Sequence, residues 1–130
     1  MFLIHTTDDG RIPSYEYLPA AAITPKVGMA LVASSGNLAV ATGATKPTYI
    51  SMAERGKAVA AGDLIPVIRV QPDVIFEVPL SAAGTSLKAG QKVTIATDGL
   101  RVTATTTDGV AEIVEILGTA AGDKVRVRFS

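Results

Sequence analysis

The sequence predicts an all-β protein, a compact β-sandwich or barrel built from two similar β units. Val, Ile and Thr are frequent, and 12 glycines and 7 prolines interrupt the 130 residues; such a composition favours short strands and tight turns. About nine or ten short apolar runs follow one another at short spacing, as is typical of sandwiches and barrels. A chain of this length is expected to form one domain and to fold without disulfides.

Residues 1–25 are predicted to form an extended N-terminal arm or an edge hairpin, ahead of a single β domain over residues 26–130. Asp9-Gly10 can adopt the positive φ angles of a two-residue hairpin turn. The segment 15–17 (Tyr-Glu-Tyr) alternates as a half-buried strand does. Prolines keep this region extended, because proline fixes φ and removes a ladder donor. They are Pro13, Pro19 and Pro25.

The first half of the β domain is predicted to contain four strands, at residues 29–33, 38–41, 48–52 and 64–70. Ser34–Asn37 is a turn signal that joins the first two strands into a hairpin. Residues 53–61 have some helical potential, but Gly56 splits the segment, so we expect a loop. Pro66 restricts its strand to a sheet edge or a bulge.

The second half is predicted to contain strands at residues 74–78, 92–96, 100–104, 110–117 and 124–129. Asp98-Gly99 marks the clearest hairpin turn of the chain, and Asp108-Gly109 marks another turn. The last strand alternates, with apolar side chains on one face and basic ones on the other. These are Val125, Val127 and Phe129 against Lys124, Arg126 and Arg128.

The chain also aligns with itself, which predicts repeat units at about residues 26–70 and 88–129. Residues 60–63 (Ala-Ala-Gly-Asp) recur letter for letter at 120–123, and 26–28 (Lys-Val-Gly) match 88–90. Apolar positions match in the same order, with Leu31, Ala33, Leu38 and Val40 falling on Val93, Ile95, Leu100 and Val102. The alternative is chance recurrence of turn chemistry. With a duplication, two units pack together and each buries a face that it could not bury alone.

Composition excludes several classes of function. The chain has no cysteine and one histidine, which excludes disulfides, thiolate zinc sites, iron–sulfur clusters and sites with several histidines. Lys and Arg number 12, as do Asp and Glu, so the formal net charge is zero. Nucleic-acid and membrane-surface binders usually carry a basic excess, so we expect neither as a partner. We also expect no signal peptide and no membrane span.

No pattern of catalytic residues stands out. Neither a phosphate-binding loop nor a Gly-x-Ser-x-Gly elbow occurs, and a Ser-His-Asp arrangement would depend on His5 in the predicted arm. Glu112 and Glu115 would point to opposite faces of a strand. Asp73 and Glu77 share a strand face, but a glycosidase pair must also flank a substrate cleft, and the chain has few aromatic residues to line one. Ser86 and Lys88 could meet on one face, but we expect them to lie in a solvated loop. We therefore expect no catalytic residue, no cofactor, no metal and no enzymatic activity.

Some side chains are candidates for an interface. The three tyrosines offer a large contact area with a polar tip, although core or edge packing explains them equally well. Two arginines of the last strand form a small basic stripe with Lys124, which suits either a salt-bridged face or an acidic protein partner. The apolar start of the arm is expected to attach to a neighbour or a shell. The candidates are Phe2, Leu3, Ile4, Tyr15, Tyr17, Tyr49, Arg126 and Arg128.

Motifs of the second half carry a resemblance through their order and spacing. They are 61–67 (Ala-Gly-Asp-Leu-Ile-Pro-Val), 75–79 (Ile-Phe-Glu-Val-Pro), 87–94 (Leu-Lys-Ala-Gly-Gln-Lys-Val-Thr), 98–103 (Asp-Gly-Leu-Arg-Val-Thr), the strand 110–117, and 120–129 (Ala-Ala-Gly-Asp-Lys-Val-Arg-Val-Arg-Phe). In this order they resemble the small capsid-decoration (head) proteins of tailed bacteriophages and prophages, formerly a family of unknown function. The resemblance covers roughly residues 60–129, and more weakly 26–52.

The resemblance implies a virion structural protein that decorates or stabilises the head by binding the outer surface of the assembled shell. Its partner would be the major capsid protein, and it would form a homo-oligomer, with a trimer favoured. It would be made in the bacterial host cytoplasm and reside on the capsid surface. The alternatives are another virion component, such as a head-fibre base, a tail protein or an adaptor, and a β-scaffold enzyme or carbohydrate-binding module.

Overall fold

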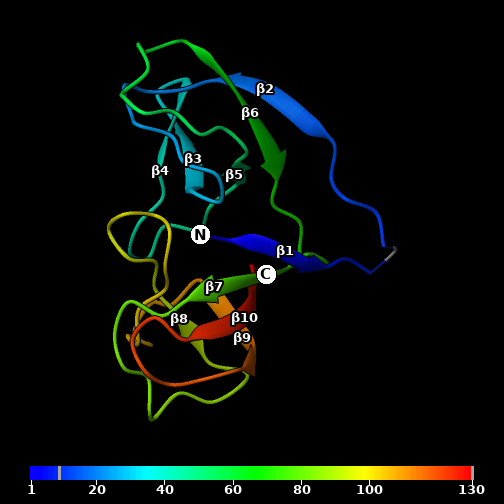
Figure 1. Ribbon diagram of the computed structural model, residues 1–130, viewed down its shortest axis with the longest axis vertical. Helices are drawn as coiled ribbons and strands as arrows, with labels where there is room; N and C mark the ends of the chain where they lie inside the picture. The colour runs from blue at the N-terminus through cyan, green and yellow to red at the C-terminus, as the bar shows by residue number, and fades with distance from the viewer. Residues whose placement is uncertain (9, 130) are drawn as a thin grey trace.

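The structure is a computed structural model that describes residues 1–8 and 10–129. Within these residues the chain is all-β, as predicted, and contains no helix. Ten strands form two five-stranded antiparallel sheets in a sandwich-like fold that is not closed into a barrel (Figure 1). The strands are β1 (Leu3–Thr6), β2 (Tyr15–Pro19), β3 (Ala30–Ser34), β4 (Asn37–Val40), β5 (Tyr49–Ser51), β6 (Leu64–Arg69), β7 (Ile75–Pro79), β8 (Lys92–Val93), β9 (Ala111–Ile116) and β10 (Lys124–Arg128).

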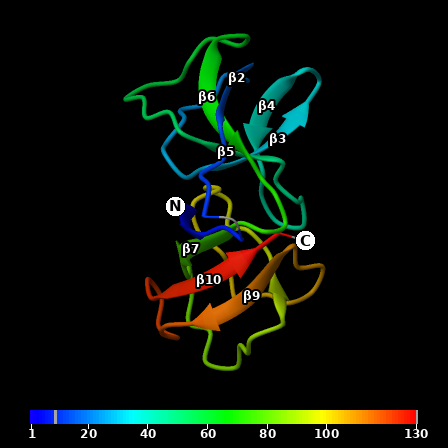
Figure 2. The same cartoon turned by 90° about the vertical axis from the view of Figure 1, so that its right-hand side faces the viewer.

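The two sheets divide the chain between its halves, except for the first strand. One sheet, here called the N-sheet, has the order β2-β6-β5-β3-β4, and the other, the C-sheet, has the order β1-β7-β10-β9-β8. The N-sheet forms the upper part of Figure 1 and the C-sheet the lower part, and both chain ends lie where the sheets meet. In the turned view of Figure 2, β7, β10 and β9 are seen side by side in the C-sheet.

Two clusters of buried apolar side chains form the core of the protein. The larger cluster fills the inner face of the C-sheet and reaches across to Ile50 and Ile68 of the N-sheet, whose side chains are fully buried. The smaller cluster lies on the opposite face of the N-sheet, around Ile65 and Val67, and is covered by the loops that carry Ala20 and Ala53. The N-sheet is therefore packed on both faces over part of its area, which explains why β6 is apolar at almost every position.

The first 25 residues differ from the predicted arm or hairpin. β1 pairs with β7 and β2 pairs with β6, so the two strands lie at the edges of different sheets and do not pair with each other. The predicted turn at Asp9 lies outside the described residues. Phe2, expected to reach a neighbour, is fully buried, with its ring centroid 5.4 Å from that of Phe129 and 6.3 Å from that of Phe76. The apolar start of the chain therefore completes the core of its own C-sheet.

Turn chemistry was predicted correctly at several positions. Ser35 and Gly36 both have positive φ between β3 and β4, as the two-residue hairpin requires. The turn at Asp98-Gly99 is also present, but the flanking hairpin is shorter than predicted. It keeps the two-residue β8 and a single bridge between Ile95 and Val102.

Equivalent segments of the two halves make the same contacts. The β2–β6 register, with Tyr17 opposite Pro66, is repeated by β7 and β10, with Glu77 opposite Arg126. Ala20 donates to the carbonyl of Asp63 at 2.8 Å, and at the matching place Leu80 donates to that of Asp123, also at 2.8 Å. Each aspartate side chain accepts from the backbone three residues earlier, at 3.0 Å and 3.1 Å. These contacts support the duplication, which stays a prediction.

One predicted match between the halves is shifted. The carbonyl of Leu38 accepts from Ala21, and in the C-terminal half it is Val102, not Leu100, whose carbonyl accepts from Ser81. The reason is the longer turn after β8, where Ala96 donates to Arg101, whereas Ser34 pairs directly with Asn37. The different turn lengths therefore change the residue offset between the two halves within this hairpin.

Candidate interface

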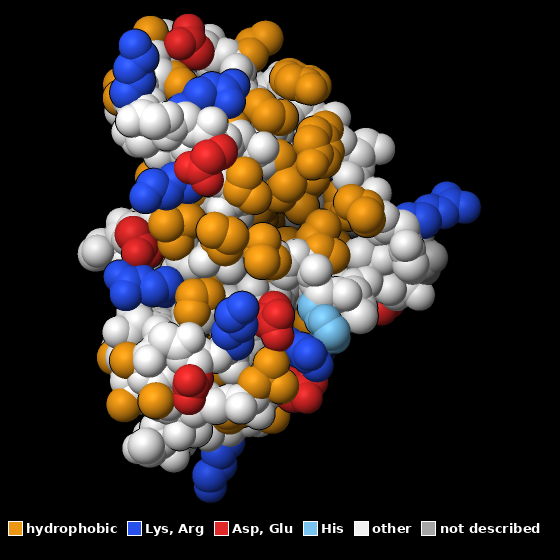
Figure 3. Space-filling view, viewed as in Figure 1, with side chains coloured by type: hydrophobic (Ala, Val, Ile, Leu, Met, Phe, Trp, Pro, Cys, Tyr) orange, Lys and Arg blue, Asp and Glu red, His pale blue; other side chains and the backbone are white. Residues whose placement is uncertain are grey.

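An apolar surface lies over β2 and β6 at the edge of the N-sheet. Cross-strand partners in an antiparallel pair point to the same face, so Tyr15, Tyr17 and Pro19 share a face with Ile68, Pro66 and Leu64, respectively. Tyr17 is 64% exposed and Leu64 is 61% exposed. We call this surface, formed by Tyr15, Tyr17, Pro19, Leu64 and Pro66, the β2–β6 face. In Figure 3, hydrophobic side chains gather where Figure 1 shows β2, β6 and the start of β1.

The opposite face of the same strands carries an ion pair that fixes β2 in place. The Arg69 guanidinium donates to both carboxylate oxygens of Glu16, at 2.9 Å and 3.2 Å. It also lies 5.1 Å from the centroid of the Tyr49 ring, within the range of a cation–π contact. The hydrogen bond to Glu16 is the main reason that the pKa of Arg69 is raised above its ordinary value. Glu16 and Arg69 therefore neutralise each other, and the tyrosine face carries no charge of its own.

The equivalent face of the C-sheet has the opposite character. Where the N-sheet has Tyr17 and Pro66, the C-sheet has Glu77 and Arg126. Arg126 donates to Glu115 at 2.7 Å and lies 3.8 Å from Glu77. Arg128 donates to Glu112 at 2.8 Å, continuing a row of cross-strand ion pairs. The C-sheet therefore exposes ion pairs at positions where the N-sheet exposes apolar side chains, and an exposed apolar patch is typical of an interaction site.

The eight candidate residues fall in separate places. Tyr15 and Tyr17 lie together on the β2–β6 face, whereas Tyr49 is half-buried against the smaller apolar cluster. Leu3, 41% exposed, and half-buried Ile4 lie on β1 of the C-sheet. The arginine stripe of β10 is ion-paired and lies on the C-sheet, away from the tyrosines. Phe2 is buried, as described above.

Two apolar residues of this face were not predicted from the sequence. Leu64 and Pro66 were assigned only to a strand, because every position of β6 from Leu64 to Ile68 is apolar and no alternation separates its faces. The internal alignment of the two halves could have identified these two residues. The positions of β10 that match Leu64 and Pro66 are Lys124 and Arg126, and this substitution of charge by apolar surface points to the uncovered face.

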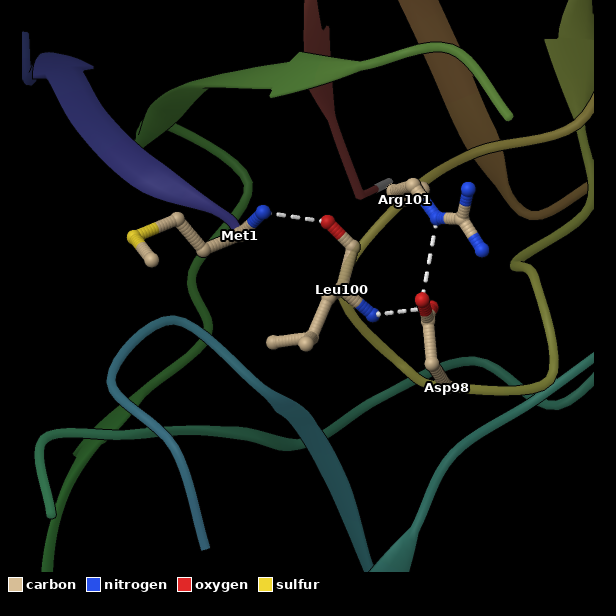
Figure 4. A network of polar contacts seen from close by, with 4 residues as sticks. All are labelled: Met1, Asp98, Leu100 and Arg101. Atoms are coloured by element: carbon tan, nitrogen blue, oxygen red, sulfur yellow. Dashed lines mark hydrogen bonds and ion pairs between the residues drawn. The ribbon is translucent and has the colours of Figure 1, made fainter. Parts of the chain in front are cut away.

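The junction between the sheets is fixed by the start of the chain. The Met1 amino group donates to the Leu100 carbonyl, while Asp98 accepts from the Leu100 amide and from Arg101, each at 2.9 Å (Figure 4). Burial is the largest cause of a lowered pKa at the Met1 amine, and Asp98 opposes it. Phe2 donates to the carbonyl of Gly28 at 2.8 Å. Because of these contacts, β1 is held to both halves of the molecule.

Two shallow grooves lie near the end of β1. The first has a volume of about 350 Å³ and is lined by Ile4, His5, Thr6, Thr7, Gly10 and Ile12. The second, of about 260 Å³, is lined by Asp8, Pro72, Asp73, Ile75 and Arg128. The described part of the chain holds no group of three or more His, Cys, Asp or Glu side chains that could bind a metal ion. It also has no helix long and apolar enough to cross a membrane.

Comparison with known proteins gives a solved structure of similar fold. It is described as the head fiber gp8.5 N base in bacteriophage phi29, and it superposes with a TM-score of 0.57 at 22% sequence identity. The similarity covers 90% of this chain and 95% of the other. No family model and no curated protein matches the chain. The two proteins therefore share a fold.

Proposed function

We propose that this protein is a structural component of a tailed-phage or prophage virion that decorates or stabilises the assembled head. The observation that carries the proposal is the β2–β6 face, which is apolar where the matching face of the C-sheet is a row of ion pairs. A rigid β scaffold with one uncovered apolar face suits a building part of a larger assembly. The motif order of residues 60–129 and the shared fold support a place on the phage head.

The proposed partners are the major capsid protein and further copies of this chain. Head shells repeat one surface many times, so a small homo-oligomer can engage several sites at once, and weak individual contacts then add to a strong attachment. The balanced formal charges of the chain fit contacts that depend on shape and apolar area. The resemblance to decoration proteins suggests a trimer or another small oligomer.

The base of a head fibre is the second candidate. The specific observation in its favour is the similar structure, which is described as such a base in phage phi29. Both candidates place the protein on the outside of the head, but they differ in effect. A decoration protein stabilises the shell lattice, whereas a fibre base needs only to hold a projecting part.

Adding the purified protein to undecorated heads tests both candidates. We expect the protein to co-sediment with heads and to raise the temperature at which they rupture and release DNA. Binding without a rise in rupture temperature would favour the fibre base over decoration. No binding to heads would refute both.

A further inference from the structure

The outer edge of β2 carries free backbone hydrogen-bonding groups. Ala20 donates to Asp63 and accepts from Gly62, both on the β6 side. Backbone groups of successive residues in a strand point to alternate sides, so Glu16 and Leu18 also face β6, and Tyr15 and Tyr17 face outward. Among residues 1–8 and 10–129, β6 is the strand that pairs along β2, and on the other side the chain makes one parallel bridge just past the end of β2, between Ala20 and Leu38 of β4. The edge therefore presents the N–H and C=O groups of two tyrosines.

The matching edge of the C-sheet is covered. β7 is the counterpart of β2, and β1 lies along its outer side, with Leu3 opposite Glu77 and Ile4 opposite Phe76. In the described part of the chain no strand lies along the outer side of Tyr15–Tyr17, ahead of the bridge from Ala20 to β4, and this open stretch borders the apolar β2–β6 face. At the place where β1 covers β7, β2 therefore has no neighbouring strand on its outer side. Open edges of this kind readily pair with another strand.

The open edge of β2 is complementary to the same edge of a second copy of the chain. The segment 13–19 (Pro-Ser-Tyr-Glu-Tyr-Leu-Pro) is nearly symmetric about Glu16. An antiparallel partner with the same sequence, centred on Glu16, would place Tyr15 of each copy opposite Tyr17 of the other. All outward N–H and C=O groups of both tyrosines would then be paired. The prolines at both ends provide no further donors, so the pairing ends where the symmetric segment ends.

We propose that the occupant of this edge is a second copy of the chain, joined through β2 in an antiparallel pair. The two N-sheets become one continuous sheet, and the tyrosines of both copies pack on the joined β2–β6 faces. Aromatic cross-strand pairs stabilise such contacts. We call the contact between the two β2 strands the seam. Each Glu16 keeps its own Arg69, so the charges at the seam are balanced. A neutral, self-complementary surface needs no oppositely charged partner. The inference goes beyond head binding and is measurable on the purified protein alone.

A single cysteine at the centre of the seam tests the geometry. The natural chain has no cysteine, so Glu16→Cys introduces the only thiol. Position 16 would form a non-hydrogen-bonded pair with itself, with Cα atoms about 4.5 Å apart, close enough for a disulfide. Under mild oxidation we expect a covalent dimer. The matched control is Lys57→Cys, on an exposed loop. Equal cross-linking of the two variants would overturn the proposal.

A charge placed on the face tests the same contact in solution. Tyr17→Lys should raise the dissociation constant of the dimer more than tenfold, measured by light scattering across a concentration series. Leu117→Lys, at an exposed apolar residue of the other half (47% exposed), should leave it unchanged. A strict monomer would overturn the proposal, and so would a trimer, because a contact centred on Glu16 has two-fold symmetry and joins only two copies. A dimer that fails to bind heads would refute the proposed function and leave this inference standing, whereas head binding by a monomer would do the reverse.

Discussion

Phe2→Ala tests whether β1 is part of the folded core. The ring is fully buried and packs against Phe76 and Phe129. Removing a buried phenylalanine side chain costs about 3–5 kcal/mol in the free energy of unfolding. For a domain of this size, a loss near the middle of that range corresponds to a fall in Tm of about 12–20 °C. We expect a cooperative transition that is shifted to lower denaturant and lower temperature.

The assay is urea denaturation followed by circular dichroism, with thermal melting as a second measure. Leu3→Ala is the matched control, because Leu3 lies on the same strand but is 41% exposed, and it should cost less than about 1 kcal/mol. A loss below about 1 kcal/mol for Phe2→Ala would refute the reasoning. The start of the chain would then be the free arm that the sequence pattern suggests.

Three further predictions concern the junction and the repeated turns. Gly28→Ala should destabilise strongly, because Gly28 has a φ of 82° and an added Cβ would lie 2.5 Å from the Cβ of Met1; a melting temperature like that of the natural protein would contradict this. Asp63→Ala and Asp123→Ala should each cost about 1 kcal/mol, and equal losses are expected because the two side chains make the same bond. Burial lowers the pKa of the Met1 amine from 8.0, so the folded state binds fewer protons there than the unfolded state. The free energy of unfolding should therefore rise as pH rises towards 8, and this slope should be absent after N-terminal acetylation.

The all-β class was predictable because local signals agree with the fold. Gly36, Gly62 and Gly122 occupy positive-φ turns, and glycine adopts them without strain. The strands between these turns are long enough to be recognised by their apolar residues. Turn chemistry is local, so one sequence is sufficient to find it.

Pairing partners were harder to predict because they depend on distant contacts. Pro66 was expected to confine its strand to an edge or a bulge, yet β6 lies between β2 and β5. The Pro66 carbonyl accepts from Met52, one residue past the end of β5, so the missing N–H removes one bond at the end of a short pairing. No local rule shows where the neighbouring strand ends. The burial of Phe2 likewise depends on aromatic partners far along the chain.

The two matching faces separate what folding needs from what assembly needs. The C-sheet folds with Glu77 and Arg126 at the positions where the N-sheet has Tyr17 and Pro66, so apolar side chains there are not required by the strand pairing. Folding alone would tolerate charged side chains at Tyr17 and Leu64, because exposed substitutions usually change stability by less than about 0.5 kcal/mol. An exposed apolar edge also carries a risk of aggregation. The natural choice of tyrosine and leucine is therefore best explained by a contact made after the chain has folded.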